Sequence, residues 1–142
     1  MKTILFVIAT VFTFCLSAQS IVGKWKTIDD ETGKPRSVVQ IEERNGKYYG
    51  KIVQLFREPR EEADPICDEC PGKRKNQKVI GMEIITAMEY DASDKEYEDG
   101  EILDPESGSI YDCKLWIEGG NLKVRGYIMF LFRTQTWLPY EG

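Results

Sequence analysis

Along most of the chain, apolar and polar residues alternate with a period of two, in short segments separated by turn residues. This period is that of a β-strand with one buried face, and turn signals recurring about every 8–12 residues are typical of a sandwich or barrel. No segment of useful length beyond residue 20 follows the helical period. The pattern predicts about eight strands, at residues 21–28, 37–42, 48–56, 78–90 with an interruption at Gly81, 96–103, 110–118, 122–130 and 133–138.

The turns between these segments favour sequential antiparallel hairpins. Asn45–Gly46 is the clearest signal, because both residues tolerate a positive φ. Eight antiparallel strands with one apolar face each must stack as two sheets or close on themselves, and closure removes exposed edges. We therefore expect an all-β fold, an antiparallel barrel of about eight strands. Gly50 and Gly126 lie inside predicted strands and are expected at bends needed for closure.

The first residues carry a different pattern. A basic start at Lys2 precedes an apolar run at residues 4–16, followed by the small residues Ser17 and Ala18. This is typical of a secretory signal peptide, and the run is shorter than the about 20 apolar residues that span a bilayer. We expect residues 1–18 to be a signal peptide, residues 19–142 to form a single domain without a membrane span, and the product to be periplasmic or extracellular.

Charge and composition narrow the possible chemistry. The formal net charge of −5 argues against nucleic acid or an anionic membrane as the main partner. The chain has no histidine, which excludes serine–histidine and cysteine–histidine catalysis and nearly all catalytic zinc sites. We therefore expect no enzyme activity, no cofactor and no metal. If the protein were a catalyst, Glu83, Asp104 and Tyr111 would be the first residues to inspect.

Three cysteines follow the predicted signal peptide. Cys67 and Cys70 form a Cys-x-x-Cys motif in the long irregular stretch at residues 57–77, and we expect them to form a disulfide. A thiol–disulfide oxidoreductase is a weaker alternative, because no helix follows the motif. Zinc is weaker still, since only Cys113 could join the pair. Cys113 lies on an apolar strand face and is expected to be buried, the alternative being a bridge to the motif.

The irregular stretch also carries a block of acidic residues followed by basic ones. Its acidic residues are Glu58, Glu61, Glu62, Asp64, Asp68 and Glu69, and the bases are Lys73, Arg74, Lys75 and Lys78. A solvated surface segment explains this pattern best. A calcium site is an alternative, although the spacing of a calcium-binding loop is absent.

Two resemblances bear on the fold. Gly23-x-Trp25 resembles the lipocalin, or calycin, signature, and that resemblance implies that Trp25 closes the barrel base with Arg133 packed across its ring. A second set of motifs covers most of the chain: Gly23-Lys24-Trp25, Gly50-Lys51-Ile52, Gly81-Met82, Ile102-Leu103-Asp104-Pro105, Gly108 with Tyr111, Lys123-Val124-Arg125-Gly126 and Arg133-Thr134-Gln135-Thr136-Trp137. This set resembles the exported bacterial proteins of domain of unknown function family 2147, and that resemblance implies fold and export but no reaction.

The many aromatic residues are compatible with two kinds of barrel interior. Such side chains either fill a small barrel or line a pocket for an apolar ligand. Our leading hypothesis is a module that binds a small hydrophobic or amphipathic molecule through Tyr49, Met82, Tyr111 and Tyr127, with the irregular stretch near the mouth. The alternative is a structural or interaction protein of the bacterial envelope. The sequence makes no prediction of oligomeric state.

Overall fold

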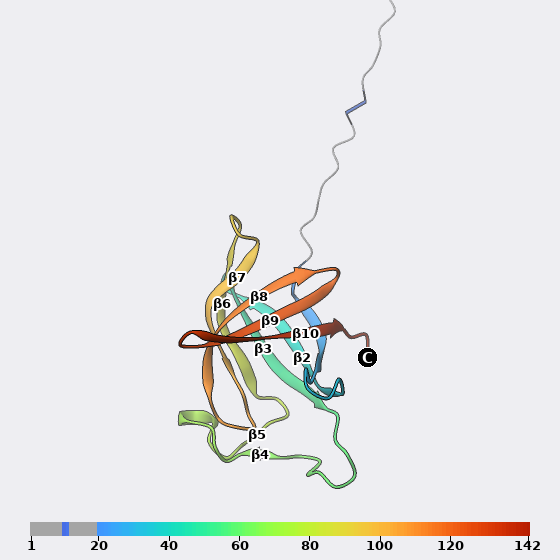
Figure 1. The fold of residues 1–142 in the computed structure, drawn as a ribbon, viewed down its shortest axis with the longest axis vertical. Coiled ribbons are helices and arrows are strands. Elements are labelled where there is room, and N and C mark those ends of the chain that lie inside the picture. The colour runs from blue at the N-terminus through green and yellow to red at the C-terminus, as the bar shows by residue number, and fades with distance from the viewer. Residues whose placement is uncertain (1–9, 12–19) are drawn as a thin grey trace, which may run out of the picture.

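The computed structural model describes residues 10–11 and 20–142, and eight of its strands close into an antiparallel barrel (Figure 1). The order around the barrel is β1-β10-β9-β8-β7-β6-β3-β2. The predicted all-β barrel is therefore confirmed. Its strands are β1 (Gly23–Ile28), β2 (Pro35–Arg44), β3 (Lys47–Leu55), β6 (Glu83–Asp91), β7 (Glu96–Leu103), β8 (Ile110–Glu118), β9 (Asn121–Ile128) and β10 (Leu131–Pro139).

The long stretch between β3 and β6 is more ordered than expected. It contains a small hairpin of β4 (Ile66–Cys67) and β5 (Gln77–Lys78), with a short 3-10 helix, η1 (Gly72–Arg74), between them. The strand predicted at 78–90 is interrupted at Gly81, as expected, and the barrel strand begins at Glu83. Gly81 has a φ of 92°, which breaks the extended backbone before the barrel strand can start.

The last hairpin also differs from the prediction. Strands were expected at 122–130 and 133–138, but Ile128 pairs with Leu131, so the turn consists of Met129 and Phe130. Neither residue is a usual turn former. The sequence does not indicate this turn, because the apolar residues on both sides of it follow the pattern of one continuous strand.

One end of the barrel is filled by side chains, and we call it the closed end. Trp25 is 4% exposed there, and its indole nitrogen donates a hydrogen bond to the carbonyl oxygen of Ile21 at 2.8 Å. The ring of Tyr97 contacts those of Tyr48 and Tyr90, with centroids 4.7 and 4.8 Å apart. The other buried residues of this end include Ile41, Met88, Leu115 and Leu122. The alternative of a filled interior is thus correct for this half of the barrel.

The expected signal peptide at residues 1–18 lies outside the described residues, apart from residues 10 and 11. Within the described ranges, the structure contains no helix of the length and apolar character needed to cross a membrane.

Gly100 in β7 is required by the close approach of β6. A Cβ at this position would overlap the backbone oxygen of Thr86 and the sulfur of Met88. We expect Gly100→Ala to lower the free energy of unfolding by about 1–3 kcal/mol, since the core cannot yield to a backbone clash. Chemical denaturation measures this change.

Gly126→Ala is the matched control, because a Cβ at Gly126 meets only Tyr111, at an ordinary 3.7 Å. We expect it to change stability by less than about 1 kcal/mol, toward greater stability. Equal losses in the two variants would contradict the assignment.

Cys113 is the free cysteine among the described residues, and it is 3% exposed in β8. Burial raises the pKa of its thiol to about 12, from an ordinary value of 9.0. At pH 8 this lowers the thiolate fraction about a thousandfold. We expect a chain beginning at Gln19 to resist thiol reagents when native and to release one reactive thiol in denaturant. Rapid labelling of the native protein would contradict this.

Candidate functional site

The other end of the barrel contains a cavity of about 710 Å³ that opens to solvent, and we call it the open end. The turns that follow β1, β7 and β9 surround it, together with the stretch after β3. Drug-sized ligands occupy pockets of about 300–1,000 Å³, so the cavity is of a suitable size. The interior is therefore half packed core and half open space.

The deep wall of the cavity is apolar. Trp137 of β10 lies there at 2% exposure, and its indole nitrogen donates to the side-chain oxygen of Gln135 at 3.0 Å. Gly126 of β9 also lines the wall, and its missing side chain leaves space beside Tyr111. The remaining apolar wall includes Ile52, Ile84, Leu103 and Val124.

Two hydroxyl groups are placed on the same wall. Thr27 of β1 and Ser37 of β2 face each other across the two strands, with their oxygens 2.8 Å apart. The backbone N–H of Ser37 also donates to the Thr27 hydroxyl at 3.0 Å. Both residues are buried, so the pair is a fixed polar element in an otherwise apolar region.

The rim of the cavity is charged: each of its three arginines is paired with a carboxylate, and Asp29, Asp68 and Asp104 leave an excess of negative charge. Arg36 pairs with Glu106, and Arg57 pairs with Glu61 at 3.2 Å. Arg133 holds Asp30 through both carboxylate oxygens, with its Nε atom 2.6 Å from Oδ2.

The guanidinium of Arg133 lowers the pKa of Asp30 below the usual carboxyl range. The pair is therefore ionised at neutral pH and weakens only as acid protonates the aspartate.

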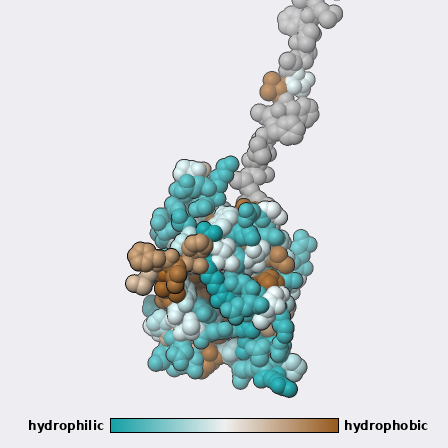
Figure 2. All heavy atoms as spheres, in the orientation of Figure 1, coloured by the Kyte–Doolittle hydropathy of each residue, from teal (hydrophilic) through white to brown (hydrophobic). Residues whose placement is uncertain are grey.

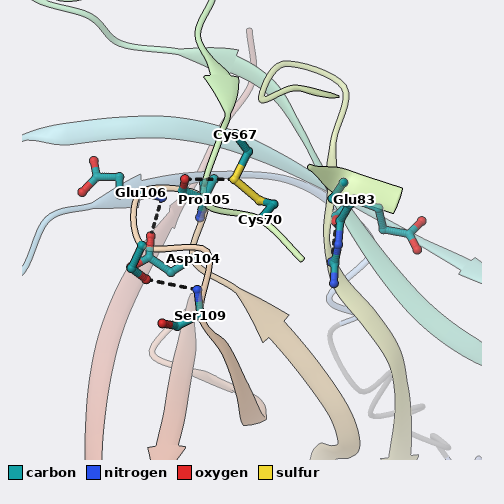
Figure 3. Close-up of a disulfide and its surroundings, with 9 residues drawn as sticks. Cys67, Cys70, Glu83, Asp104, Pro105, Glu106 and Ser109 are labelled. Carbon is teal, nitrogen blue, oxygen red and sulfur yellow. Dashed lines mark hydrogen bonds between the residues drawn. A yellow bond between two sulfur atoms is a disulfide. The ribbon is translucent and has the colours of Figure 1, made fainter. Parts of the chain in front are cut away.

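The disulfide anchors the irregular stretch beside the mouth. Cys67 and Cys70 are bonded, as predicted, and both side chains are buried. The Cys67 sulfur lies 3.2 Å from the carbonyl oxygen of Pro105, in the turn between β7 and β8 (Figure 3). A Cβ on Gly108 of that turn would overlap the Glu69 carbonyl. The two segments therefore pack closely, and Pro65, Ile66 and Asp68 line the cavity.

The expected packing of Arg133 on Trp25 is wrong. Trp25 pairs with Pro139 of β10, six residues beyond Arg133 and about 20 Å along the strand. Trp25 lies at the closed end, whereas Arg133 is at the open end with Asp30. The residue types fit the lipocalin signature, but the strand register separates them.

Of the four predicted ligand-binding residues, the structure places one at the cavity. Tyr111 lines it. Met82 is buried outside it, in the core before β6. The prediction that Tyr49 and Tyr127 line it is wrong: the Tyr49 ring lies under the Arg44 guanidinium at 3.9 Å, and Tyr127 contacts Phe132. Each tyrosine is one residue away from a strand position that faces inward, Gly50 for Tyr49 and Gly126 for Tyr127, and successive strand residues point to opposite faces.

The residues considered for catalysis do not converge. Asp104 lines the cavity, but its carboxylate accepts hydrogen bonds from the Glu106 N–H at 2.9 Å and the Ser107 hydroxyl at 3.0 Å, which shape its own turn. Glu83 is paired with Arg44 at 2.5 Å and does not line the cavity. The three candidates thus form no joint site.

Sequence reasoning missed several wall and rim residues. Gln135 and Trp137 share the inward face of β10 with Arg133, a period of two that is visible in the sequence. Thr27 and Ser37 interrupt apolar strand faces, which is the signal of a polar group facing the interior. Arg36 and Arg57 carry no comparable signal, because their place at the mouth depends on how the turns fold over it.

One group of carboxylates lies away from the cavity, at the β6–β7 turn. The ligand oxygens of Asp91, Asp94 and Glu98 all lie within 4.8 Å of one another. Hydrogen bonds from Ser93 lower the pKa of Asp91, and the nearby Asp91 raises that of Glu98. These contacts shape the turn itself and give no reason to assign an ion.

Comparisons with known proteins agree with this architecture. A search of curated proteins found no match. A search of solved structures found similarity to "Protein HP1028 from the human pathogen Helicobacter pylori belongs to the lipocalin family", with 17% identity, a TM-score of 0.70, and coverage of 86% of this chain and 84% of that chain. At this identity the likeness shows the fold alone, and it confirms a lipocalin-like barrel. A family model described as "Uncharacterized protein conserved in bacteria (DUF2147)" matches residues 23–138, and the chain therefore belongs to that family.

Proposed function

We propose that this protein binds one small hydrophobic or amphipathic molecule inside its barrel. The observation that supports this most directly is the cavity of about 710 Å³ at the open end, walled by apolar side chains. The cavity opens to solvent at its rim, and its deep wall is apolar. An apolar group that enters it would therefore be removed from water, which is favourable.

The arrangement of polar groups favours an amphipathic ligand oriented lengthwise. Its apolar part would contact Trp137 and Val124 deep in the cavity, where few polar groups are available. Its polar end would lie at the rim, within reach of Arg36, Arg57 and Arg133. Each of these guanidinium groups is already paired with a carboxylate, so the rim presents hydrogen-bond donors and acceptors together and suits a polar end group of either kind.

Binding is better supported than catalysis. The chain has no histidine, and the carboxylate of Asp104 is engaged in its own turn. We also propose that the protein acts outside the cytoplasm, in the periplasm or beyond the cell. The apolar run at residues 4–16 and the Cys67–Cys70 disulfide support export.

A bulky side chain introduced into the cavity provides the first test. We expect the native protein to bind one equivalent of the amphipathic dye anilinonaphthalenesulfonate, with a change in Trp137 emission. Gly126→Phe should weaken this binding at least tenfold, because the new ring occupies the space beside Tyr111. Fluorescence titration measures the affinity, and circular dichroism verifies the fold.

A matched pair of tyrosine variants separates the cavity from the outer surface. Tyr111→Ala removes a wall residue and should change dye affinity severalfold, whereas Tyr49→Ala lies outside the cavity and should leave it unchanged. Undiminished binding by a folded Gly126→Phe protein would contradict the proposal.

Native mass spectrometry of protein purified from its own host would address the natural ligand. A reproducible extra mass that is lost in Gly126→Phe would support carriage. A protein that is always empty, and that also fails to bind the dye, would shift weight to an interaction role.

A further inference from the structure

The β9–β10 hairpin ends in a run of exposed apolar side chains at residues 128–132, which we call the apolar tip. Met129 and Phe130 are 91% and 98% exposed, and Ile128, Leu131 and Phe132 are 52%, 75% and 62% exposed. Figure 2 shows this hydrophobic projection on a mostly hydrophilic surface, where Figure 1 places the hairpin end. Five consecutive exposed apolar residues are an error in a soluble fold unless they have a function.

The chemistry of this turn is unlike that of the other two-residue hairpins. The β2–β3 turn is Asn45–Gly46 and the β8–β9 turn is Gly119–Gly120, and all four residues have a positive φ. Met129 also has a positive φ, of 53°, where glycine or asparagine is preferred. An apolar side chain is therefore present at the tip against local backbone preference.

Behind the tip lies a cluster of aromatic rings around one cation. The Arg125 guanidinium lies 4.8 Å from the ring centroid of Trp116 and 4.5 Å from that of Phe132. Tyr127 also contacts Phe132, with centroids 6.2 Å apart. Amphipathic aromatic residues and long cationic side chains of this kind gather where a bilayer meets water.

The spacing matches the depth of that boundary. Arg125 pairs with Thr134, three positions behind the Ile128–Leu131 pair and about 10 Å along the strand. Surface-bound elements bury their apolar side chains about 5–10 Å into the headgroup and acyl boundary. With the tip inserted to that depth, Arg125 would lie at the level of the lipid phosphates.

We infer that the apolar tip docks this protein onto the surface of a phospholipid bilayer. A bilayer needs no complementary shape, whereas a stable protein interface takes about 20–30 residues on each side, far more than the tip offers. The tip carries no charge and the chain is acidic, with a net charge of −5, so zwitterionic lipids suit it best.

Docking would also bring the cavity to the membrane. Ile128, Leu131 and Phe132 form part of the cavity lining as well as the tip. A docked barrel would therefore exchange an amphipathic ligand with the bilayer at its rim. This consequence rests on the proposed ligand-binding function, whereas docking itself does not.

Sedimentation with phosphatidylcholine vesicles tests the docking. We expect the native protein to partition onto the vesicles, with little dependence on salt, and the double variant Met129→Asp, Phe130→Asp to partition at least tenfold less. Val22→Asp is the control, since Val22 is 48% exposed before β1 at the closed end. It should bind as the native protein does. Native protein that ignores vesicles, or equal binding by the double variant, would overturn the inference.

A tryptophan probe reports insertion without removing apolar character. Phe130→Trp should shift its emission to the blue when vesicles are added, and Val22→Trp should not. The absence of a shift at position 130 would overturn the inference. So would a tip-dependent dimer, detected by analytical ultracentrifugation, that binds no vesicles.

The two proposals fail separately. The double variant should still bind anilinonaphthalenesulfonate in solution, because neither Met129 nor Phe130 lines the cavity. Dye binding without vesicle binding in the native protein would overturn docking alone, and vesicle binding without dye binding would overturn the cavity function alone.

Discussion

The whole architecture depends on β1 having a partner along both of its edges. It pairs with β2 from Gly23 onward, and with β10 through Trp25↔Pro139 and Lys26↔Leu138. The backbone N–H of Tyr140 extends this second seam, donating to the Lys24 carbonyl at 3.0 Å. An eight-stranded barrel is only wide enough to be filled by side chains or to hold one small ligand. In the closed barrel, the size of each inward residue therefore determines whether the space around it is packed core or cavity.

The inward residues differ in size between the two halves of the barrel. At the closed end, large inward residues such as Met88, Leu115 and Tyr97 meet and exclude space. At the open end, large residues such as Trp137 also line the interior, but small ones take several inward positions, with Gly126 opposite Cys113 and Thr27 opposite Ser37. The cavity arises where inward side chains are small or absent, and the packed half provides the stability that such a cavity requires.

Local patterns in the sequence were sufficient for the strands and for the Asn45–Gly46 hairpin, because alternation and turn chemistry act over a few residues. They were insufficient where register decides the outcome. Trp25 and Arg133 have the residue types of a stacked pair, but pairing across β1 and β10 sets them far apart. The Met129–Phe130 turn was missed for a different reason: neither residue follows the usual turn preferences, so no local signal marks it. The residues of the cavity rim could not be predicted, because they come from turns that are distant in sequence.

The forces at the two ends also differ in kind. The closed end is held by buried apolar contacts, which open only when the barrel unfolds. The rim is held by ion pairs between separate segments, such as Arg36 with Glu106 and Arg133 with Asp30, in which the side chains are 31–69% exposed. Exposed pairs of this kind contribute about 0–1 kcal/mol each, so the rim can part without loss of the fold. A base held by buried contacts and a mouth held in part by exposed ion pairs would suit exchange of the ligand that we propose.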